Sequence, residues 1–264
     1  MKKEKLTGIE GFDIYYKRLF GARWDTLKPA LLAETEQTAY RENLIRPYYL
    51  DYASIQAAKA MPELNEGTCL DMCAAPGGKT LVLLSKMNER VQITANEISG
   101  SRRNRLIKVL NEHLIEKDKS RITVSGYDAC KMPRYNRDAY DRILLDAPCS
   151  SERHIIQNEK YLKQWSEARI KNLAQRQWAL LSAAFLLLKP KGFLLYSTCA
   201  LSKFENDCAV KRLSEKYNDA IRICKLEREY EPPLAEKTEY GYLFLPDTAE
   251  GAGPMYFSLI QKKE

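Results

Sequence analysis

The sequence predicts an α/β protein with a doubly wound, mostly parallel sheet, and two observations carry that prediction. Short apolar runs of strand length, such as Thr68–Cys73 and Tyr140–Asp146, alternate with longer helical patterns. Polar and sulfur-bearing residues follow these runs, at the strand ends where open parallel sheets bind their ligands. They are Asp71, Glu97, Asp128, Asp146, Cys149 and Cys199.

The charge balance is compatible with a polyanionic partner but does not require one. The formal net charge is +7 and the isoelectric point is about 8.9. Basic residues cluster in one helical stretch, where they form either a solvated face or a nucleic-acid contact. They are Arg102, Arg103, Arg105 and Lys108.

The composition fits a soluble globular chain with room for one core and an appendage. The chain has 264 residues, of which 45% are hydrophobic and 29% are charged. Residues 1–47 contain two helical pieces rich in aromatic residues, Phe12–Leu19 and Trp24–Leu32. We expect residues 1–47 to form a small helical extension of the main domain at residues 48–264. This extension either packs on the core or serves as a nucleic-acid-contacting arm.

The sequence pattern predicts neither a targeting segment nor a metal cluster. No apolar run approaches the roughly 18 residues that span a bilayer, and the charged Met1–Lys5 is not followed by the apolar segment of a signal peptide. A cytoplasmic protein without a membrane partner is therefore expected. Seven cysteines without a C-x-x-C pair, together with two histidines, favour neither a zinc cluster nor a disulfide framework.

A glycine-rich turn joins the first predicted strand to a helix that starts near Leu81. The turn, residues 74–80, contains Pro76 and the pair Gly77–Gly78. Such a turn lets the backbone approach a ligand and offers free N–H groups at the helix start, as in nucleoside- and dinucleotide-binding sheets. A P-loop is disfavoured because Cys73 stands where that motif needs glycine, and G-x-G-x-x-G is also absent.

The next two predicted strands end near acidic residues that suit a nucleoside ligand. Val91–Glu97 is rich in β-forming residues, and Glu97 lies about 20 residues beyond the glycine turn, where such sheets place a ribose acceptor. A generic surface glutamate is the alternative. Ile122–Ser125 forms the following short strand, and Asp128 beyond it is a candidate acceptor for an adenine amino group.

The remaining predicted elements continue the alternation of helices and strands. Helices are expected at residues 55–61, 99–113, 160–188 and 205–217, and further strands at residues 193–196 and 255–260. The helix at residues 160–188 is expected to stop at Lys189–Gly192, which contains a proline and a glycine.

Three segments together resemble motifs of one enzyme family. Asp71–Thr80 (DMCAAPGGKT), Asp146–Ser150 (DAPCS) and Ser197–Cys199 (STC) look like motifs I, IV and VI of the RsmB/NSUN (Sun-type) RNA cytosine-5 methyltransferases. The resemblance runs from about residue 48 to residue 263 and implies a seven-stranded, Rossmann-like methyltransferase sheet. The leader at residues 15–21, together with residues 48–51, is similar to the mitochondrial ribosome-modifying branch.

The resemblance implies a reaction that uses two thiols. A thiolate that adds to carbon 6 of cytosine makes carbon 5 nucleophilic enough to accept a methyl group from S-adenosylmethionine. A base then removes the carbon 5 proton so that the thiolate can leave. By position in the motifs, Cys199 is implied as the nucleophile and Cys149 as the residue that assists resolution. Asp146 is implied to contact the cytosine edge, with Lys79 as its electrostatic support.

The same resemblance implies which residues hold S-adenosylmethionine and RNA. The turn surrounds the methionine moiety, Glu97 binds the ribose and Asp128 binds the adenine. The implied cofactor set is Cys73, Ala74, Ala75, Pro76, Gly77, Gly78, Lys79, Glu97, Arg102, Asp128 and Asp146. The expected RNA contacts are Arg102, Arg103, Arg105, Lys108, Arg153 and His154. No metal is expected.

The segment after the second motif departs from the family pattern. Many members continue with a Gly-x-Gly turn, whereas this chain has Ser151–His154, in which His154 is either a proton shuttle or a loop residue. The leading hypothesis is 5-methylcytosine formation in ribosomal RNA, with tRNA as the second substrate and a ribosomal subunit or assembly factor as partner. Rival hypotheses are a non-catalytic RNA-binding assembly factor and a DNA cytosine methyltransferase that uses Cys149 as its nucleophile.

Overall fold

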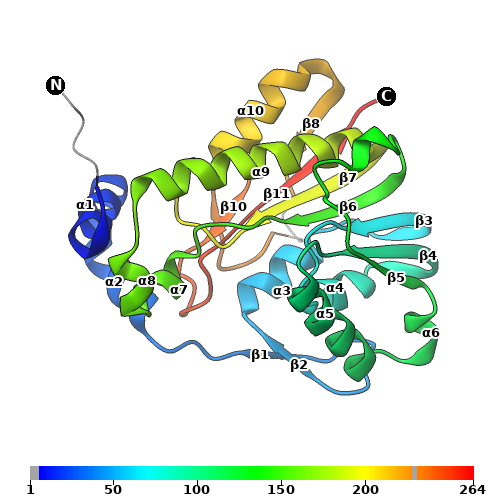
Figure 1. The fold of residues 1–264 in the computed structure, drawn as a ribbon, viewed down its shortest axis with the longest axis horizontal. Coiled ribbons are helices and arrows are strands. Elements are labelled where there is room, and N and C mark those ends of the chain that lie inside the picture. The colour runs from blue at the N-terminus through cyan, green and yellow to red at the C-terminus, as the bar shows by residue number, and fades with distance from the viewer. Residues whose placement is uncertain (1–5, 228–230) are drawn as a thin grey trace.

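The computed structural model describes residues 6–227 and 231–264, and a mostly parallel sheet lies at its centre (Figure 1). The charged leader at residues 1–5 lies outside the described residues. Five of the strands run parallel, and their bounds are β3 (Leu64–Asp71), β4 (Met87–Asn96), β5 (Ile122–Ser125), β6 (Tyr140–Asp146) and β7 (Leu188–Thr198). They lie in the order β5-β4-β3-β6-β7. The predicted doubly wound, mostly parallel sheet is confirmed.

An antiparallel edge extends the sheet beyond β7. β11 (Met255–Lys262) pairs with β7, and β8 (Ile221–Cys224) and β10 (Tyr242–Phe244) both pair with β11. β9 (Glu236–Lys237) completes the edge by pairing with β10. Within the described residues the sheet has nine strands instead of the expected seven, because β9 and β10 lengthen this edge.

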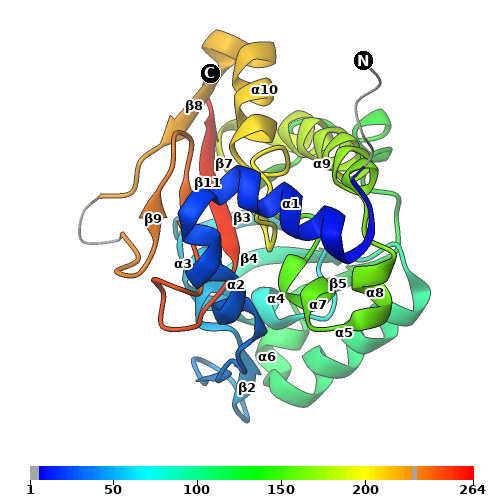
Figure 2. The same ribbon diagram turned by 90° about the vertical axis from the view of Figure 1, so that its left-hand side faces the viewer.

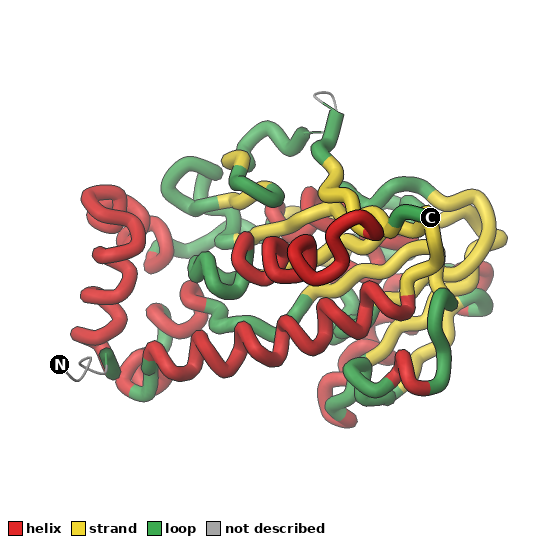
Figure 3. The backbone as a smooth tube through the Cα atoms, turned by 90° about the horizontal axis from the view of Figure 1, so that it is seen from above, coloured by secondary structure: helices red, strands yellow, loops and turns green. Residues whose placement is uncertain are grey.

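Helices cover both faces of the sheet, as a doubly wound fold requires (Figures 1 and 3). Alternate residues of a strand point to opposite faces, so Cys69 belongs to the core on one side and Leu70 to the core on the other. The first layer consists of α3 (Tyr52–Lys59), α4 (Gly78–Leu84) and α5 (Gly100–His113), and the second of α9 (Glu167–Leu187) and α10 (Asp207–Tyr217).

The N-terminal helices form an aromatic cluster against the helices that follow β6 (Figure 2). Phe12, Tyr16, Trp24 and Trp165 are all buried there, and the ring centroids of Phe12 and Trp165 are 5.5 Å apart. The extension is therefore packed on the core. The helices involved are α1 (Gly8–Phe20), the 3-10 turn η1 (Gly21–Arg23), α2 (Trp24–Leu32), α7 (Glu152–Ile156) and α8 (Glu159–Lys163).

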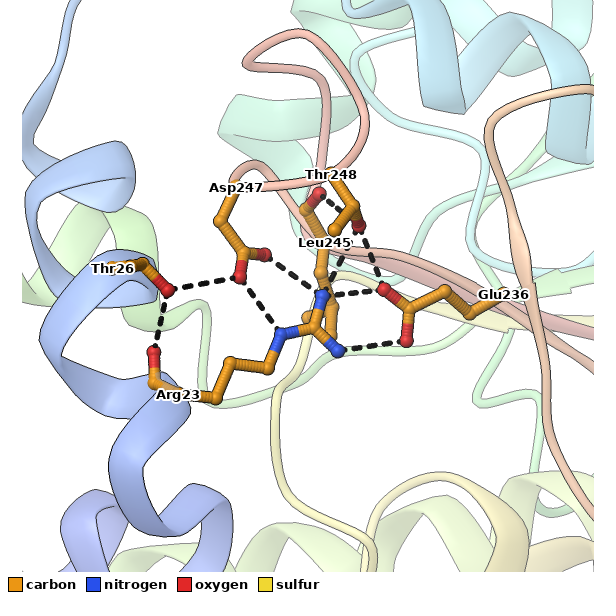
Figure 4. A network of polar contacts seen from close by, with 6 residues as sticks. All are labelled: Arg23, Thr26, Glu236, Leu245, Asp247 and Thr248. Atoms are coloured by element: carbon orange, nitrogen blue, oxygen red, sulfur yellow. Dashed lines mark hydrogen bonds and ion pairs between the residues drawn. The ribbon is translucent and has the colours of Figure 1, made fainter.

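Arg23 joins this extension to the C-terminal part of the chain (Figure 4). Its Nε donates to Asp247 Oδ2 at 2.8 Å, and its Nη1 donates to Glu236 Oε2 at 2.8 Å. Thr26 Oγ1 donates to the Arg23 carbonyl oxygen at 3.0 Å. Glu236 belongs to β9, so one guanidinium bridges the N-terminal helices to the added edge of the sheet.

Short elements lie between the main helices and strands along the chain. β1 and β2 pair antiparallel, with Ala39 opposite Tyr49, so this hairpin crosses the boundary drawn between residues 47 and 48. The bounds of the short elements are β1 (Thr38–Tyr40), β2 (Tyr48–Leu50), α6 (Glu116–Lys119), η2 (Met132–Arg134) and η3 (Asn218–Ala220).

The single helix expected at residues 160–188 is wrong, because the chain breaks between α8 and α9 at residues 164–166. Gly8 N donates to Trp165 O at 2.8 Å, and Thr7 forms a β-bridge with Ser166. The break buries Trp165 among the aromatic residues of the extension, which a continuous helix could not do. In the part of the chain that the structure describes, no helix has the length and apolar character needed to cross a membrane.

Candidate active site

The glycine turn between β3 and α4 is shaped by close contacts on both sides. A Cβ on Gly77, whose φ is +118°, would lie 3.1 Å from Val109 Cγ1 on α5. A Cβ on Gly78 would lie 2.8 Å from Tyr48 Cε1 on β2. Glycine is needed at both positions because the turn is wedged between α5 and the hairpin. The backbone thereby lines a cavity directly.

The acidic residues after β4 and β5 line a second cavity, which adjoins the first at Cys73. Its volume is about 250 Å³. Glu97 is 3% exposed, and its Oε1 accepts a hydrogen bond from Ser99 N at 2.9 Å. Asp128 Oδ1 accepts from Cys130 N at 3.1 Å. The structure therefore brings the predicted ribose and adenine acceptors to one cavity.

Arg102 links this cavity to the glycine turn. Its Nη1 lies 3.2 Å from Glu97 Oε2, and its Nη2 donates to Ala75 O at 2.8 Å. Arg103 Nη1 donates to the Glu97 carbonyl oxygen at 2.9 Å. Both guanidinium groups on α5 thus hold the loops around the site in place.

Asp71, at the end of β3, is an almost completely buried acid of the turn cavity. Its Oδ2 accepts from Thr80 Oγ1 at 2.7 Å, while its Oδ1 is buried without a well-formed hydrogen bond among the described residues. Burial raises the pKa of Asp71 to about 7 in spite of the Thr80 hydrogen bond. Asp71 lines the turn cavity, and the sequence indicates it both by its place at a strand end and as the first residue of the Asp71–Thr80 motif.

Lys79 and Asp146 form an ion pair between the turn and the end of β6. Lys79 Nζ donates to Asp146 Oδ2 at 2.9 Å, and Ser197 Oγ donates to Asp146 Oδ1 at 2.9 Å. Burial acts to lower the pKa of Lys79, but Asp146 outweighs it and the pKa is raised. Asp146 also lines the turn cavity, so the predicted Lys79–Asp146 pair faces the ligand space.

Cys149 and Cys199 are free thiols that meet at the ends of neighbouring parallel strands. Their Sγ atoms are 2.9 Å apart. The hydrogen bond from Cys149 is the main reason that the pKa of Cys199 is lowered, with Ser151 and Lys79 acting in the same direction against burial. The pKa of Cys149 is raised well above its ordinary value, first because of Cys199 and then because of burial. At this distance one thiol can donate a hydrogen bond to the other once the second is ionised, and the directions of the two pKa shifts favour ionisation at Cys199.

Two buried carboxyl groups lie directly behind the thiol loops, and the sequence reasoning missed both. Ser150 Oγ contacts Oε1 of Glu152 and Oε2 of Glu205, and Leu201 N donates to Glu152 Oε2 at 3.0 Å. Burial raises the pKa of Glu205 to about 7 and also raises the pKa of Glu152. One hydroxyl hydrogen cannot be donated to both carboxylates, and the raised pKa values of Glu152 and Glu205 favour a proton shared within this cluster.

An open cleft of about 340 Å³ leads to Cys199 from the side of α7 and the C-terminal loop. Arg153 lines it and donates to Gly251 O at 2.8 Å and to Ala30 O at 2.9 Å. His154 is exposed at the same cleft, and its ring centroid lies 5.2 Å from that of Tyr161. Of the expected RNA contacts on α5, Arg102, Arg105 and Lys108 are exposed and Arg103 is half-buried.

Fold and site together first define a class: a Rossmann-like α/β protein with a nucleoside-type glycine turn and paired thiols at neighbouring strand ends. The chain belongs to the family described as 16S rRNA methyltransferase RsmB/F, whose model matches residues 58–261. The family resemblance inferred from the three motifs is thereby confirmed.

Two curated relatives illustrate the family. The chain is 34% identical over 226 residues to "5-cytosine rRNA methyltransferase NSUN4" of Bos taurus, a match that covers 79% of this chain and 59% of the relative. It is 39% identical over 203 residues to "Ribosomal RNA small subunit methyltransferase F" of Shewanella loihica, covering 74% of this chain and 40% of the relative. The chain thus spans only part of the length of each.

Two solved structures share the fold at low sequence identity. A methyltransferase homolog protein from Pyrococcus horikoshii has a TM-score of 0.74 at 20% identity, covering 95% of this chain and 94% of that one. NSun6 from the same organism, solved with SFG, has a TM-score of 0.70 at 24% identity, covering 88% of this chain and 56% of that one.

Proposed function

We propose that this protein methylates carbon 5 of cytosine in RNA, with ribosomal RNA as the favoured substrate and S-adenosylmethionine as the methyl donor. One observation carries the proposal: two thiols with opposite pKa shifts lie 2.9 Å apart beside a cavity lined by nucleoside acceptors. Membership of the family and the printed names of the relatives support the same reaction.

The residues of the two cavities fit S-adenosylmethionine. Glu97 and Asp128 offer buried and half-buried carboxylate acceptors for a ribose and an adenine. Asp71 Oδ1 lacks a well-formed partner, and carboxylates near the turn suit a positively charged ligand. A side chain at Gly78 would crowd the same space. When bound there, S-adenosylmethionine supplies an electrophilic methyl group for carbon 5.

The protein residues divide the remaining chemistry between them. The Cys199 thiolate bonds to carbon 6, and Asp146, fixed by Lys79 and Ser197, contacts the polar edge of the base. Bond formation removes the hydrogen-bonded Cys199 thiolate, and the hydrogen bond with Cys199 is the largest contribution that raises the pKa of Cys149, ahead of burial and of the Cys199 charge. Cys149 can then lose its proton to water in the open cleft and, as a thiolate, accept the carbon 5 proton. The electron pair of the carbon–hydrogen bond forms the double bond between carbons 5 and 6, and the electron pair of the carbon–sulfur bond returns to Cys199.

The RNA substrate must present an unstacked cytosine, because the attacking thiol, Cys199, lines a cleft that a base inside a stack cannot enter. Single-stranded loops and accessible assembly intermediates of ribosomal RNA meet this requirement, and tRNA is the second candidate. Arg105 and Lys108 supply exposed positive charge, which gives salt-dependent affinity for phosphates. A ribosomal subunit or assembly factor as partner, and a cytoplasmic location, belong to the same proposal.

The domain organisation also enters as a proposal: residues 1–47 extend a catalytic domain at residues 48–264. The bond from Tyr16 to Glu152 and the Arg23 contacts support an extension that stabilises the catalytic loops rather than one that moves freely.

The decisive experiment compares Cys149→Ala and Cys199→Ala with S-adenosylmethionine and ribosomal RNA on a denaturing gel. Cys149→Ala is expected to accumulate an RNase-sensitive covalent adduct, and Cys199→Ala to form none and to methylate nothing. Cys208→Ala, which changes an exposed cysteine on α10, is the matched control and should behave as wild type.

Other outcomes of this gel separate the rival functions. An adduct with Cys199→Ala alone would exchange the roles of the thiols, as a DNA-type cytosine methyltransferase requires. A third outcome is that neither variant forms an adduct and that wild type binds the cofactor but transfers no methyl group. This outcome would contradict the proposal and support a non-catalytic RNA-binding factor.

A further inference from the structure

A third polar side chain touches both thiols. Ser151 Oγ lies 3.2 Å from Cys199 Sγ and 3.5 Å from Cys149 Sγ. It also lies 3.5 Å from the Cys149 carbonyl oxygen. A hydroxyl has one hydrogen to donate, and Cys199 Sγ is its nearest acceptor. Hydrogen bonds to an ionised acceptor are the stronger ones, so a thiolate at Cys199 attracts this hydrogen most.

The backbone of Ser151 indicates that its side chain is used. Its φ is 56° and its ψ is 57°, which is the left-handed region where glycine is accommodated without strain. A side chain is held here in spite of that strain, and such residues cluster at functional sites. Among the contacts described for the Ser151 hydroxyl, the shortest is to Cys199.

The neighbours of Ser151 fix the hydroxyl in place. Ser150 N donates to Glu205 Oε1 at 2.9 Å on one side, and Leu201 N donates to Glu152 Oε2 at 3.0 Å on the other. Both acids are buried, so the loops that carry Ser151 and Cys199 are anchored to a common support. A group positioned in advance in this way loses little free energy to reorganisation when charge develops.

We propose that Ser151 is a catalytic residue, whose hydroxyl donates a second hydrogen bond to the Cys199 thiolate beside the bond from Cys149. This role rests on the proposed function, in which Cys199 attacks carbon 6. Two donors favour the ionised form of the sulfur and hold it where it lines the cleft. When the carbon–sulfur bond forms, the sulfur loses its charge and the Ser151 hydroxyl is free to turn toward Cys149 Sγ.

Other charged and titratable groups also act on Cys199, and a test must keep them constant. Cys149, Lys79 and Asp146 face the thiol from the surrounding strand ends and turn, and Asp51, Arg153 and His154 line the cleft beyond it. Substitutions confined to Ser151 leave all of these groups in place.

The experiment compares Ser151→Gly with Ser151→Ala. Glycine suits the positive φ and removes the hydroxyl, whereas alanine removes the hydroxyl and keeps the backbone strain. Asn43→Gly is the matched control, because Asn43 is exposed, has a φ of 57° and belongs to the β1–β2 turn. The readout is the rate at which iodoacetamide alkylates Cys199 as a function of pH, with the Cys199 and Cys149 peptides quantified separately by mass spectrometry.

Both Ser151 variants are expected to move the pH midpoint of Cys199 alkylation upward by about one unit, the size expected for one lost hydrogen bond to a charged group. At pH values below both midpoints the alkylation rate should fall about tenfold, and the pH profile of methyl transfer should shift in the same direction. Asn43→Gly should leave the midpoint unchanged.

Two results would overturn the role of Ser151. One is an unchanged midpoint in both variants; the other is a shift with glycine and none with alanine, which would assign the effect to the backbone. Alkylation needs neither RNA nor cofactor, so the result of this test does not depend on whether the proposed function is correct. If the midpoint shifts while wild type methylates no RNA, Ser151 stabilises the thiolate and the assignment of the reaction is wrong.

Discussion

The phenol of Tyr16, in the first helix, donates a hydrogen bond to the carboxyl group of Glu152, three residues beyond Cys149. Both side chains are buried. Glu152 also accepts from Leu201 N, two residues beyond Cys199, at 3.0 Å. One carboxyl group therefore joins the N-terminal helix to both loops that carry the thiols.

Removing the Tyr16 hydroxyl should destabilise the fold. Tyr16→Phe removes one of the two hydroxyl groups that contact Oε1 of the buried Glu152 carboxyl group, and we expect a loss of about 1–3 kcal/mol in the free energy of unfolding. Urea denaturation monitored by tryptophan fluorescence measures this loss. Tyr15→Phe is the matched control, because the Tyr15 hydroxyl makes a longer contact, 3.4 Å to Ser202 Oγ, in a partly buried position. Equal stability of Tyr16→Phe and wild type would contradict the importance of this bond.

Glu205 should make stability depend on pH in a defined direction. Its folded-state pKa is raised to about 7 by burial, so the folded protein binds more protons than the unfolded chain between the two pKa values. The free energy of unfolding therefore falls as the pH rises from about 4.5 to about 7. For a shift of this size the contribution is on the order of 3 kcal/mol, as an upper bound.

Glu205→Gln tests this slope. The variant lacks the titrating group, so it should lose less stability than wild type between pH 5 and pH 8, whatever its absolute stability. The measurement is a series of urea denaturations across that range. Parallel pH dependence in the two proteins would show that Glu205 is already ionised in the folded state.

Loss of the Lys79 charge should impair the site without unfolding it. Lys79→Met removes the partner of Asp146 and a positive charge that lowers the pKa of Cys199. We expect methyl transfer to fall about 10²-fold, the usual effect of removing one electrostatic stabiliser, and the midpoint of Cys199 alkylation to rise. Lys86→Met is the control, because Lys86 pairs with the exposed Glu63 at 3.1 Å. Wild-type rates in Lys79→Met would exclude this role.

A side chain at Gly78 should weaken cofactor binding. The new Cβ of Gly78→Ala would lie 2.8 Å from Tyr48 Cε1, so the turn or the hairpin must shift beside the ligand cavity. We expect at least about a tenfold loss of affinity for S-adenosylmethionine in isothermal titration calorimetry, which corresponds to 1.4 kcal/mol. Gly100→Ala is the control, since the nearest atom to its Cβ is 4.0 Å away. Unaltered affinity in Gly78→Ala would place the cofactor elsewhere.

Much of the site could be predicted from the sequence because its parts lie at strand ends. The glycine turn, Glu97, Asp128 and the two motif cysteines each sit next to a recognisable strand, and parallel strands bring their carboxyl ends to one edge. The break between α8 and α9 escaped prediction because residues 160–188 have helical composition throughout. Only the contact of Trp165 with the N-terminal helices interrupts them.

The sequence by itself determined the fold class, the family and the chemistry available at the strand ends. The tertiary structure decided which side chains act together: β6 pairs with β7 so that Asp146 lies opposite Ser197, and the loops beyond them bring Cys149 to Cys199. The roles of Ser151, Glu152 and Glu205 follow only from that pairing. Periodicity and motifs describe neighbours along the chain, whereas burial, shared protons and opposite pKa shifts arise between segments about 50 residues apart or more, which packing alone brings together.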